Sequence, residues 1–246
     1  RIKQNADAVC VAQWKVMEED ILKLGTLEDS VVMVDTSCSM HSPDYLPFDV
    51  AVSLGLLISR ATKGKFKDHV ITFNDVPEFV LINDGPLFNR WCQVTGISCS
   101  RSTNIQGTFD LILERGKTFG LTHEDMPKRL FIISDTQFNH INGYGRSTNF
   151  EVIEKKYAAS GYTRPQIVFW NVNGAYSDFP VSVDDHGTVL ISGFSHSVMK
   201  AILNVKDFSP YSVMRDALDS DRLRPVRVAL GVNEEKKMEF DDVDEE

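Results

Sequence analysis

The chain has 246 residues, of which 42% are hydrophobic and 10% aromatic, enough to build the core of one large domain or two small ones. Its formal net charge of -9 disfavours a surface that follows nucleic-acid phosphates, so we expect no direct nucleic-acid binding by this chain alone. No apolar stretch approaches the roughly 20 residues that cross a bilayer, so we expect no membrane association.

The four cysteines, Cys10, Cys38, Cys92 and Cys99, are scattered along the chain. They show neither the density of a secreted disulfide scaffold nor the paired C-x-x-C spacing of a zinc knuckle. We therefore expect reduced thiols and an intracellular, cytoplasmic location. Because the sequence begins with Arg1 rather than methionine, we also expect it to be either a processed chain or part of a longer protein.

Residues 1–85 predict two helices and three strands. Apolar residues near a 3.6-residue period predict an amphipathic helix over residues 6–24, and LPFDVAVSLGLLISRAT predicts a strongly apolar helix over 46–62. Between them, the all-apolar run SVVMVD (30–35) is typical of a strand buried on both faces of a parallel sheet. The segments DHVITF (68–73) and EFVLI (78–82) flank the turn N-D-V-P and predict an antiparallel hairpin.

From residue 86 on, the chain continues the alternation of apolar strands with amphipathic helices. The predicted strands are RLFIISD (129–135), QIVFWNV (166–172) and TVLISG (188–193). The predicted helices cover 86–94, 105–119, 149–160, 196–204 and 210–219. This alternation predicts an α/β fold with a doubly wound, mostly parallel sheet, one antiparallel edge strand and helices on both faces.

The chain shows no internal repeat and no Pro- or Gly-rich linker. We expect residues 1–27 to form an N-terminal helix packed on or leading into the domain, and residues 28–232 to form one domain. Residues 233–246, NEEKKMEFDDVDEE, carry many charges and little to bury, which predicts an acidic, disordered tail.

Polar side chains follow the predicted strands at the edge where ligands bind in a doubly wound sheet. Two strands end in aspartate, at Asp35 and Asp135, and the loop SRSTN brings Thr103 to the same edge. In an extended turn, side chains two residues apart point the same way. In D-x-S-x-S those of Asp35, Ser37 and Ser39 can therefore all face one ion. This all-oxygen set predicts a site for a hard divalent cation, Mg²⁺ or Mn²⁺.

Other interpretations of these residues stay open. The aspartates and serines could cap helices or close turns at the strand ends. Cys38 and His41 form a C-x-x-H pair, but two ligands do not make a zinc site. Ser37 could be a nucleophile, although no G-x-S-x-G elbow surrounds it, and the chain has no P-loop motif.

The residues D-T-S-C-S-M, a distant T-N and then S-D resemble the metal-ion-dependent adhesion site of von Willebrand factor A domains, over residues 28–205. The resemblance implies that Ser37, Ser39 and Thr103 supply hydroxyl ligands and that Asp35 and Asp135 hold the ion directly or through water. One position departs from that pattern: Cys38 stands where the family usually has glycine, so we expect a slightly altered or strained loop.

The stretches STNIQGTFDLIL, FIISDTQF and LISGFSHSVMKAIL look closer still to uncharacterised intracellular proteins of the DUF2828 type, whose arrangement is similar to that of the RNA-binding TROVE proteins. That resemblance implies that the chain is the C-terminal part of a larger protein. Around the cation we expect a partner-binding rim of four polar side chains, His41, Asn104, Asn139 and His140.

The resemblance implies a metal-dependent protein-binding module with no catalytic role, in which an acidic side chain of a protein partner completes the coordination of the ion. Two alternatives come from other classes of function. The chain could belong to a ribonucleoprotein and bind RNA together with a partner region. It could also be a metal-dependent phosphoryl hydrolase that uses Asp35.

Overall fold

The structure is a computed structural model that describes residues 8–25, 27–41, 45–97, 104–135, 146–173, 188–193 and 223–229. The chain divides into two compact units, Arg1–Asn204 and Val205–Glu246. The first unit holds the sheet, and helix α8 (Arg224–Ala229) belongs to the second. The domain boundaries at residues 27 and 232 stay predictions.

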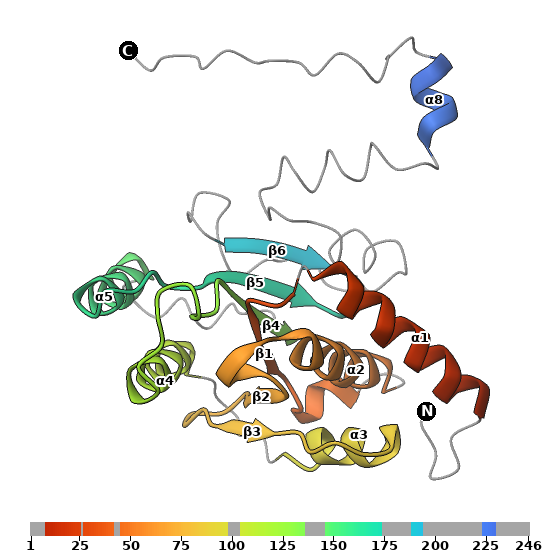
Figure 1. Ribbon diagram of the computed structural model, residues 1–246, viewed down its shortest axis with the longest axis horizontal. Helices are drawn as coiled ribbons and strands as arrows, with labels where there is room; N and C mark the ends of the chain where they lie inside the picture. Colours follow the sequence, from red (N-terminus) through yellow and green to blue (C-terminus); the bar gives the residue numbers. More distant parts are fainter. Residues whose placement is uncertain are drawn as a thin grey trace. The chain divides into compact units, whose positions relative to one another are not determined.

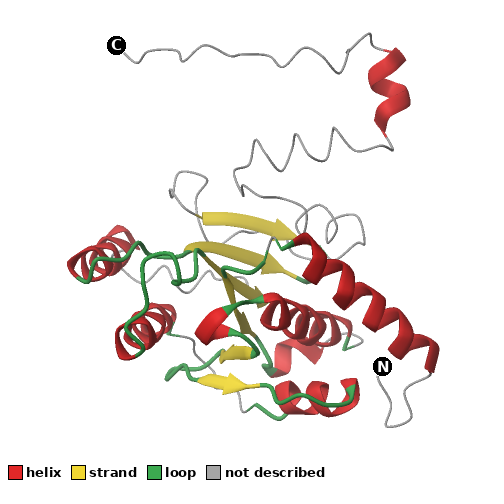
Figure 2. Cartoon of the chain, in the orientation of Figure 1, coloured by secondary structure: helices red, strands yellow, loops and turns green. Residues whose placement is uncertain are grey.

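A six-stranded sheet with the order β3-β2-β1-β4-β5-β6 forms the centre of the first unit. All neighbouring strands run parallel except β2 and β3, which pair antiparallel at one edge. The predicted architecture is therefore confirmed, and Figure 2 shows the strands between helices on both sides. The strands are β1 (Ser30–Val34), β2 (His69–Thr72), β3 (Phe79–Leu81), β4 (Arg129–Ser134), β5 (Gln166–Asn171) and β6 (Thr188–Ser192).

The helices of the first unit follow the predicted order, and their ends differ from the predicted ones by at most three residues. They are α1 (Ala8–Leu24), α2 (Leu46–Ala61), α3 (Leu87–Thr95), α4 (Ile105–Thr118) and α5 (Arg146–Ala159). Two 3-10 helices, η1 (Cys38–His41) and η2 (Gly64–Phe66), were not predicted because they are too short to show a period. The predicted helices 196–204 and 210–219 lie outside the described residues.

Alternate residues of the buried strands pack against different helices. Met33 of β1 and Ile132 of β4 join a core cluster with Phe109 of α4 and Tyr157 of α5. On the opposite face, α2 lies so close to β1 that a Cβ added at Gly55 would come within 2.4 Å of Val34 Cγ2. The sheet is thus covered by α4 and α5 on one side and by α2, with α1 outside it, on the other (Figure 1).

Helix α1 buries less of its apolar surface than its sequence pattern predicted. Trp14 and Ile21 are buried, whereas Val9, Val11 and Leu22, which belong to the same pattern, are 58%, 41% and 45% exposed. The reason is that the contacts of α1 within the described residues are mainly with α2, so that one narrow stripe is covered. No helix in the described ranges is both long and apolar enough to cross a membrane.

Candidate metal site

The register of β1 and β4 brings the two predicted aspartates to one edge of the sheet. These strands are parallel neighbours, with Val34 opposite Ile133. One residue further, the Asp35 amide donates to the Ile133 carbonyl at 2.9 Å, so the ladder continues to the end of both strands. Asp35 and Asp135 therefore both follow the carboxyl ends of adjacent central strands, as the crevice rule predicts.

The Asp35 carboxylate is completely buried and is held from two directions. Its Oδ1 accepts a hydrogen bond of 2.8 Å from the Ser37 amide, which curls the loop after β1 back on itself. Its Oδ2 accepts a hydrogen bond from the Ser134 hydroxyl of β4. The position of Asp35 is therefore fixed both by its own loop and by the neighbouring strand.

A chain of hydroxyl groups connects the first loop to Asp135. The Ser37 and Ser39 hydroxyl oxygens lie 2.9 Å apart, and Ser39 donates to Asp135 Oδ1 at 3.0 Å. Because Ser39 has one hydroxyl proton and gives it to Asp135, Ser37 must be the donor to Ser39. Both serine oxygens keep at least one lone pair, so each can still coordinate a cation.

Asp135 is 8% exposed and forms no ion pair with any residue that the structure describes. Burial raises the pKa of its carboxyl group, the nearby Asp35 charge raises it further, and the hydrogen bond from Ser39 opposes both. The Asp135 amide donates to the sulfur of the buried Met40 at 3.1 Å. The carboxylates of Asp35 and Asp135 thus lie near each other. The hydrogen-bond donor to the Asp135 carboxylate within the described residues, the Ser39 hydroxyl, is neutral.

Of the slightly altered or strained loop expected at Cys38, the strain is not found. Cys38 begins η1, and the non-glycine residues with positive φ in the described ranges are Tyr45 and Asp68. A 3-10 helix has the negative φ that any L-residue adopts, so the loop has no need of glycine here. The Cys38 thiol is exposed and reduced.

A zinc site at the C-x-x-H pair gains no support from the structure. Across the described segments, no three His, Cys, Asp or Glu side chains gather in a way that could hold a metal ion. Cys38 and His41 therefore remain two ligands. The predicted Asp35 set is of a different kind, because most of its members are hydroxyl groups.

The rim residues that the structure describes have packing and capping roles. The His41 ring stacks on Phe48, with centroids 4.4 Å apart, and contacts Tyr45 edge-on at 4.9 Å. Asn104 caps α4, since its side chain accepts a 2.8 Å hydrogen bond from the Gly107 amide. A Cβ at Gly107 would lie 2.9 Å from Asn104 Nδ2, so glycine makes room for this cap.

Three predicted residues, Thr103, Asn139 and His140, lie outside the described residues. The neighbouring Asn104 amide donates to the Asn74 carbonyl beyond β2 at 3.2 Å, which attaches the start of α4 to the same edge of the sheet. Sequence reasoning did not find Ser134 or Met40. The signal for Ser134 was present, because strand alternation and the parallel register place it beside Asp35 on one face.

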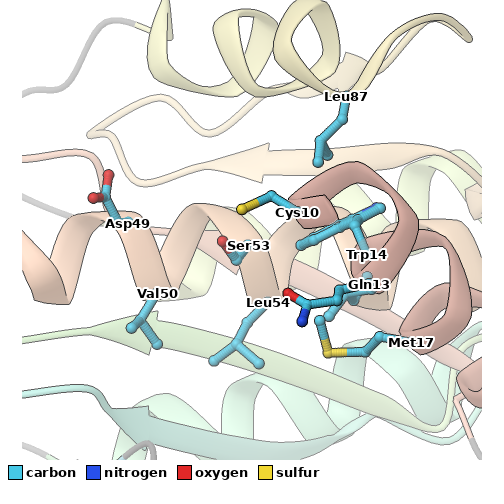
Figure 3. Close-up of a pocket in the computed structure, with 10 residues that line it drawn as sticks. Cys10, Gln13, Trp14, Met17, Asp49, Val50, Ser53, Leu54 and Leu87 are labelled. Atoms are coloured by element: carbon cyan, nitrogen blue, oxygen red, sulfur yellow. The ribbon is translucent and has the colours of Figure 1, made fainter. Parts of the chain in front are cut away.

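A separate hollow of about 350 Å³ lies between α1, α2 and the start of α3. Trp14, Leu54 and Leu87 contribute apolar surface, while the thiol of Cys10 and the hydroxyl of Ser53 reach the same space (Figure 3). None of the predicted metal-binding residues lines it. The candidate metal site is therefore an edge of the sheet and is distinct from this groove.

A family model described as "Domain of unknown function (DUF7788)" matches residues 29–243. The chain belongs to this family. The finer resemblance to the DUF2828 type stays a prediction. The chain is also 32% identical over 221 residues to "Uncharacterized protein L728" of Acanthamoeba polyphaga mimivirus, a match that covers 89% of this chain and 38% of that protein. The chain thus spans well under half the length of this relative.

Two solved structures show a distant likeness to this DUF7788 chain. The Ro (RSR) protein of Deinococcus radiodurans has a TM-score of 0.48 and 12% identity, covering 74% of this chain and 35% of that one. Proximal thread matrix protein 1 of the mussel byssus, with a zinc-occupied MIDAS motif, has a TM-score of 0.46 and 13% identity, covering 73% and 47%. The mostly parallel sheet with its antiparallel edge pair is the architecture that the resemblance to von Willebrand factor A domains implied.

Proposed function

We propose that this chain is a divalent-metal-dependent protein-binding module and part of a larger intracellular protein, with its cation at the carboxyl ends of β1 and β4. The proposed ligands, bound directly or through water, are Asp35, Ser37, Ser39, Thr103 and Asp135. The observation that carries the proposal is the continuous contact from Ser37 through Ser39 to Asp135.

The donor chemistry fits Mg²⁺ or Mn²⁺. Carboxylate and hydroxyl oxygens are hard ligands, and hard divalent cations prefer oxygen. Burial raises the pKa of Asp135 and the Asp35 charge raises it further, so the charged form of this carboxyl is disfavoured without a cation. A divalent cation would neutralise that charge together with the charge of Asp35, which gives the bound ion an electrostatic advantage.

The proposed partner presents an acidic side chain. Mg²⁺ usually keeps several waters among its six ligands, so a partner carboxylate can replace one of them. The chain carries a net charge of -9, which repels an acidic partner unless the cation is present. Binding should therefore disappear on chelation, and not merely weaken.

A paired peptide array tests this proposal. Each immobilised peptide carries one central Glu, and its twin carries Gln at the same position. With Mg²⁺ present, we expect the chain to bind a subset of Glu peptides and none of their Gln twins, and chelation should abolish the binding.

The variants Ser37→Ala and Ser59→Ala give a matched comparison for the array. Ser37 belongs to the proposed site, whereas the Ser59 hydroxyl donates to Leu56 O within α2. Ser37→Ala should lose binding and Ser59→Ala should retain it. Equal binding of Glu and Gln peptides, or binding that persists with chelator, would overturn the proposal.

A further inference from the structure

A second polar cluster lies where the end of α4 meets η2 and β2. The Arg115 side chain donates to the Lys65 carbonyl through Nε at 2.9 Å and Nη2 at 2.7 Å. Its guanidinium carbon lies 4.4 Å from the ring centroid of Phe79 and 5.5 Å from that of Phe119. Carbonyl oxygen and ring faces therefore surround this cation, and it has no carboxylate partner among the described residues.

The hydrogen bonds of His69 fix the protonation state of its ring. The distance from Nδ1 to the Lys67 carbonyl oxygen is 2.6 Å, and a carbonyl can only accept, so Nδ1 carries the proton. Nε2 lies 2.9 Å from Arg115 Nη2, which can only donate. His69 is therefore a neutral Nδ1-H tautomer whose Nε2 lone pair binds Arg115.

Protonation of His69 is incompatible with this arrangement. A proton on Nε2 would point at an Arg115 N–H, so that two donors and two positive charges would face each other. Burial lowers the pKa of His69, and the charge of Arg115 lowers it further, while the Lys67 carbonyl and the Asp68 carboxylate oppose the shift.

The other charged groups around His69 do not remove the repulsion between a protonated His69 and Arg115. The Asp68 carboxylate is bound by Arg60 of α2 at 3.2 Å, so it is already compensated. The Lys65 ammonium lies over the Phe119 ring, 4.9 Å from its centroid. The net effect of burial, Arg115, Lys67 and Asp68 is a lowered pKa of His69, which favours its neutral form.

We propose that His69 and Arg115 form a pH-sensitive latch, which holds the last turn of α4 against β2 while His69 is neutral and opens when His69 is protonated. Both ends of α4 are attached next to β2. The Asn104 amide binds Asn74 O beyond one end of the strand, and Arg115 binds His69 at the other. When the latch opens, the last turn of α4 loses its contact with His69 of β2, while Phe109 and Ile112 keep the middle of the helix in the core.

Histidine NMR titration and hydrogen exchange test the latch itself. In the unmodified chain, His69 should show the Nδ1-H tautomer at pH 7.5 and titrate below 6.5, and Arg115→Gln should raise its pKa. After correction for intrinsic pH effects, amide exchange over residues 111–118 should increase several-fold from pH 7.5 to pH 5.5. A His69 pKa at or above 6.5, or exchange that does not respond to this pH change, would overturn the latch.

Two glutamine variants separate His69 from other histidines. His69→Gln keeps an acceptor for Arg115 but cannot titrate, so its exchange should not respond to pH. His123, which contacts the Thr163 hydroxyl at 2.9 Å on the surface, provides the matched control His123→Gln, which should behave like the unmodified chain. An equal response in His69→Gln and the unmodified chain would contradict the proposal.

Discussion

The aspartate carboxylates at the two ends of β1 and β4 differ in how their charge is compensated. At the amino ends, Asp29 forms ion pairs with Arg129 and with Lys128, the latter at 3.4 Å. At the carboxyl ends, Asp135 accepts a hydrogen bond from Ser39 and forms no ion pair within the described ranges. The charge of Asp29 is thus compensated by cationic side chains, whereas Asp135 has a neutral hydrogen-bond donor. This difference supports an external cation at the carboxyl ends, where α/β sheets bind ligands.

The largest loss of stability is expected from a substitution at the amino ends of β1 and β4. Arg129→Met removes the more buried of the two cations that pair with Asp29 and leaves this carboxylate, whose side chain is only 26% exposed, with the exposed Lys128 alone. We expect the free energy of unfolding to fall by roughly 2–3 kcal/mol, less than for a fully buried pair because Asp29 is partly exposed and keeps Lys128. Urea unfolding at pH 7 measures it.

Lys128→Met is the matched control, because Lys128 is 66% exposed and an exposed pair contributes about 0.5 kcal/mol. If both variants lost equally little stability, the amino-end pair would not be the internal compensation described above, and the contrast between the ends would disappear.

An intermediate loss of stability is expected from replacing the uncharged Asn104, which lies at the same edge of the sheet as the candidate metal site. Asn104→Ala removes the cap of α4 and should lower the free energy of unfolding by about 1 kcal/mol. Asn104→Asp keeps a capping oxygen and should restore most of that loss. Thermal or urea unfolding of both variants checks this, and unchanged stability in Asn104→Ala would show that the cap contributes nothing.

The smallest expected effect is the pH-dependent contribution of Asp135 to the free energy of unfolding when no divalent ion is present. Its folded-state pKa is raised above the ordinary 3.8, so its favourable contribution is present below that value and is lost as the pH rises through the folded-state pKa. Relative to the unmodified chain, Asp135→Asn should therefore become more stable as the pH rises. Unfolding at a series of pH values, with chelator present, measures this difference.

Asp125 gives a control of opposite sign. Hydrogen bonds from Thr122 lower the pKa of this exposed carboxyl, so its contribution is lost as the pH falls. Asp125→Asn should therefore lose stability relative to the unmodified chain at neutral pH and approach it in acid. The same slope in both variants would contradict the account of Asp135.

The sequence predicted those parts of the molecule that depend on a repeating pattern. The run SVVMVD and the run RLFIISD have the composition of buried parallel strands, and the crevice rule then placed Asp35 and Asp135 at one edge. The turn N-D-V-P between two short strands likewise predicted the antiparallel edge pair.

The missed features depend on contacts between distant residues or on short elements. Met40 lies beneath Asp135 because η1 turns after Ser37, and a four-residue 3-10 helix leaves no periodic signal. The contact between His69 and Arg115 joins residues 46 positions apart, so no local pattern could reveal it. The cap by Asn104 was also missed, because Asn104 was assigned to the partner-binding rim, although asparagine before a helix is a known capping signal.

The most direct test of the central claim is calorimetric titration of Mg²⁺ and Mn²⁺ into chelator-treated protein, with Ser37→Ala and Asp135→Asn alongside. We expect saturable binding at one site in the unmodified chain and in Ser59→Ala, and none in the two site variants. A cation at a hundredfold excess over its Kd should also raise the free energy of unfolding by about 2.7 kcal/mol. Equal binding in the site variants, or no binding in the unmodified chain, would contradict a cation site at the carboxyl ends of β1 and β4.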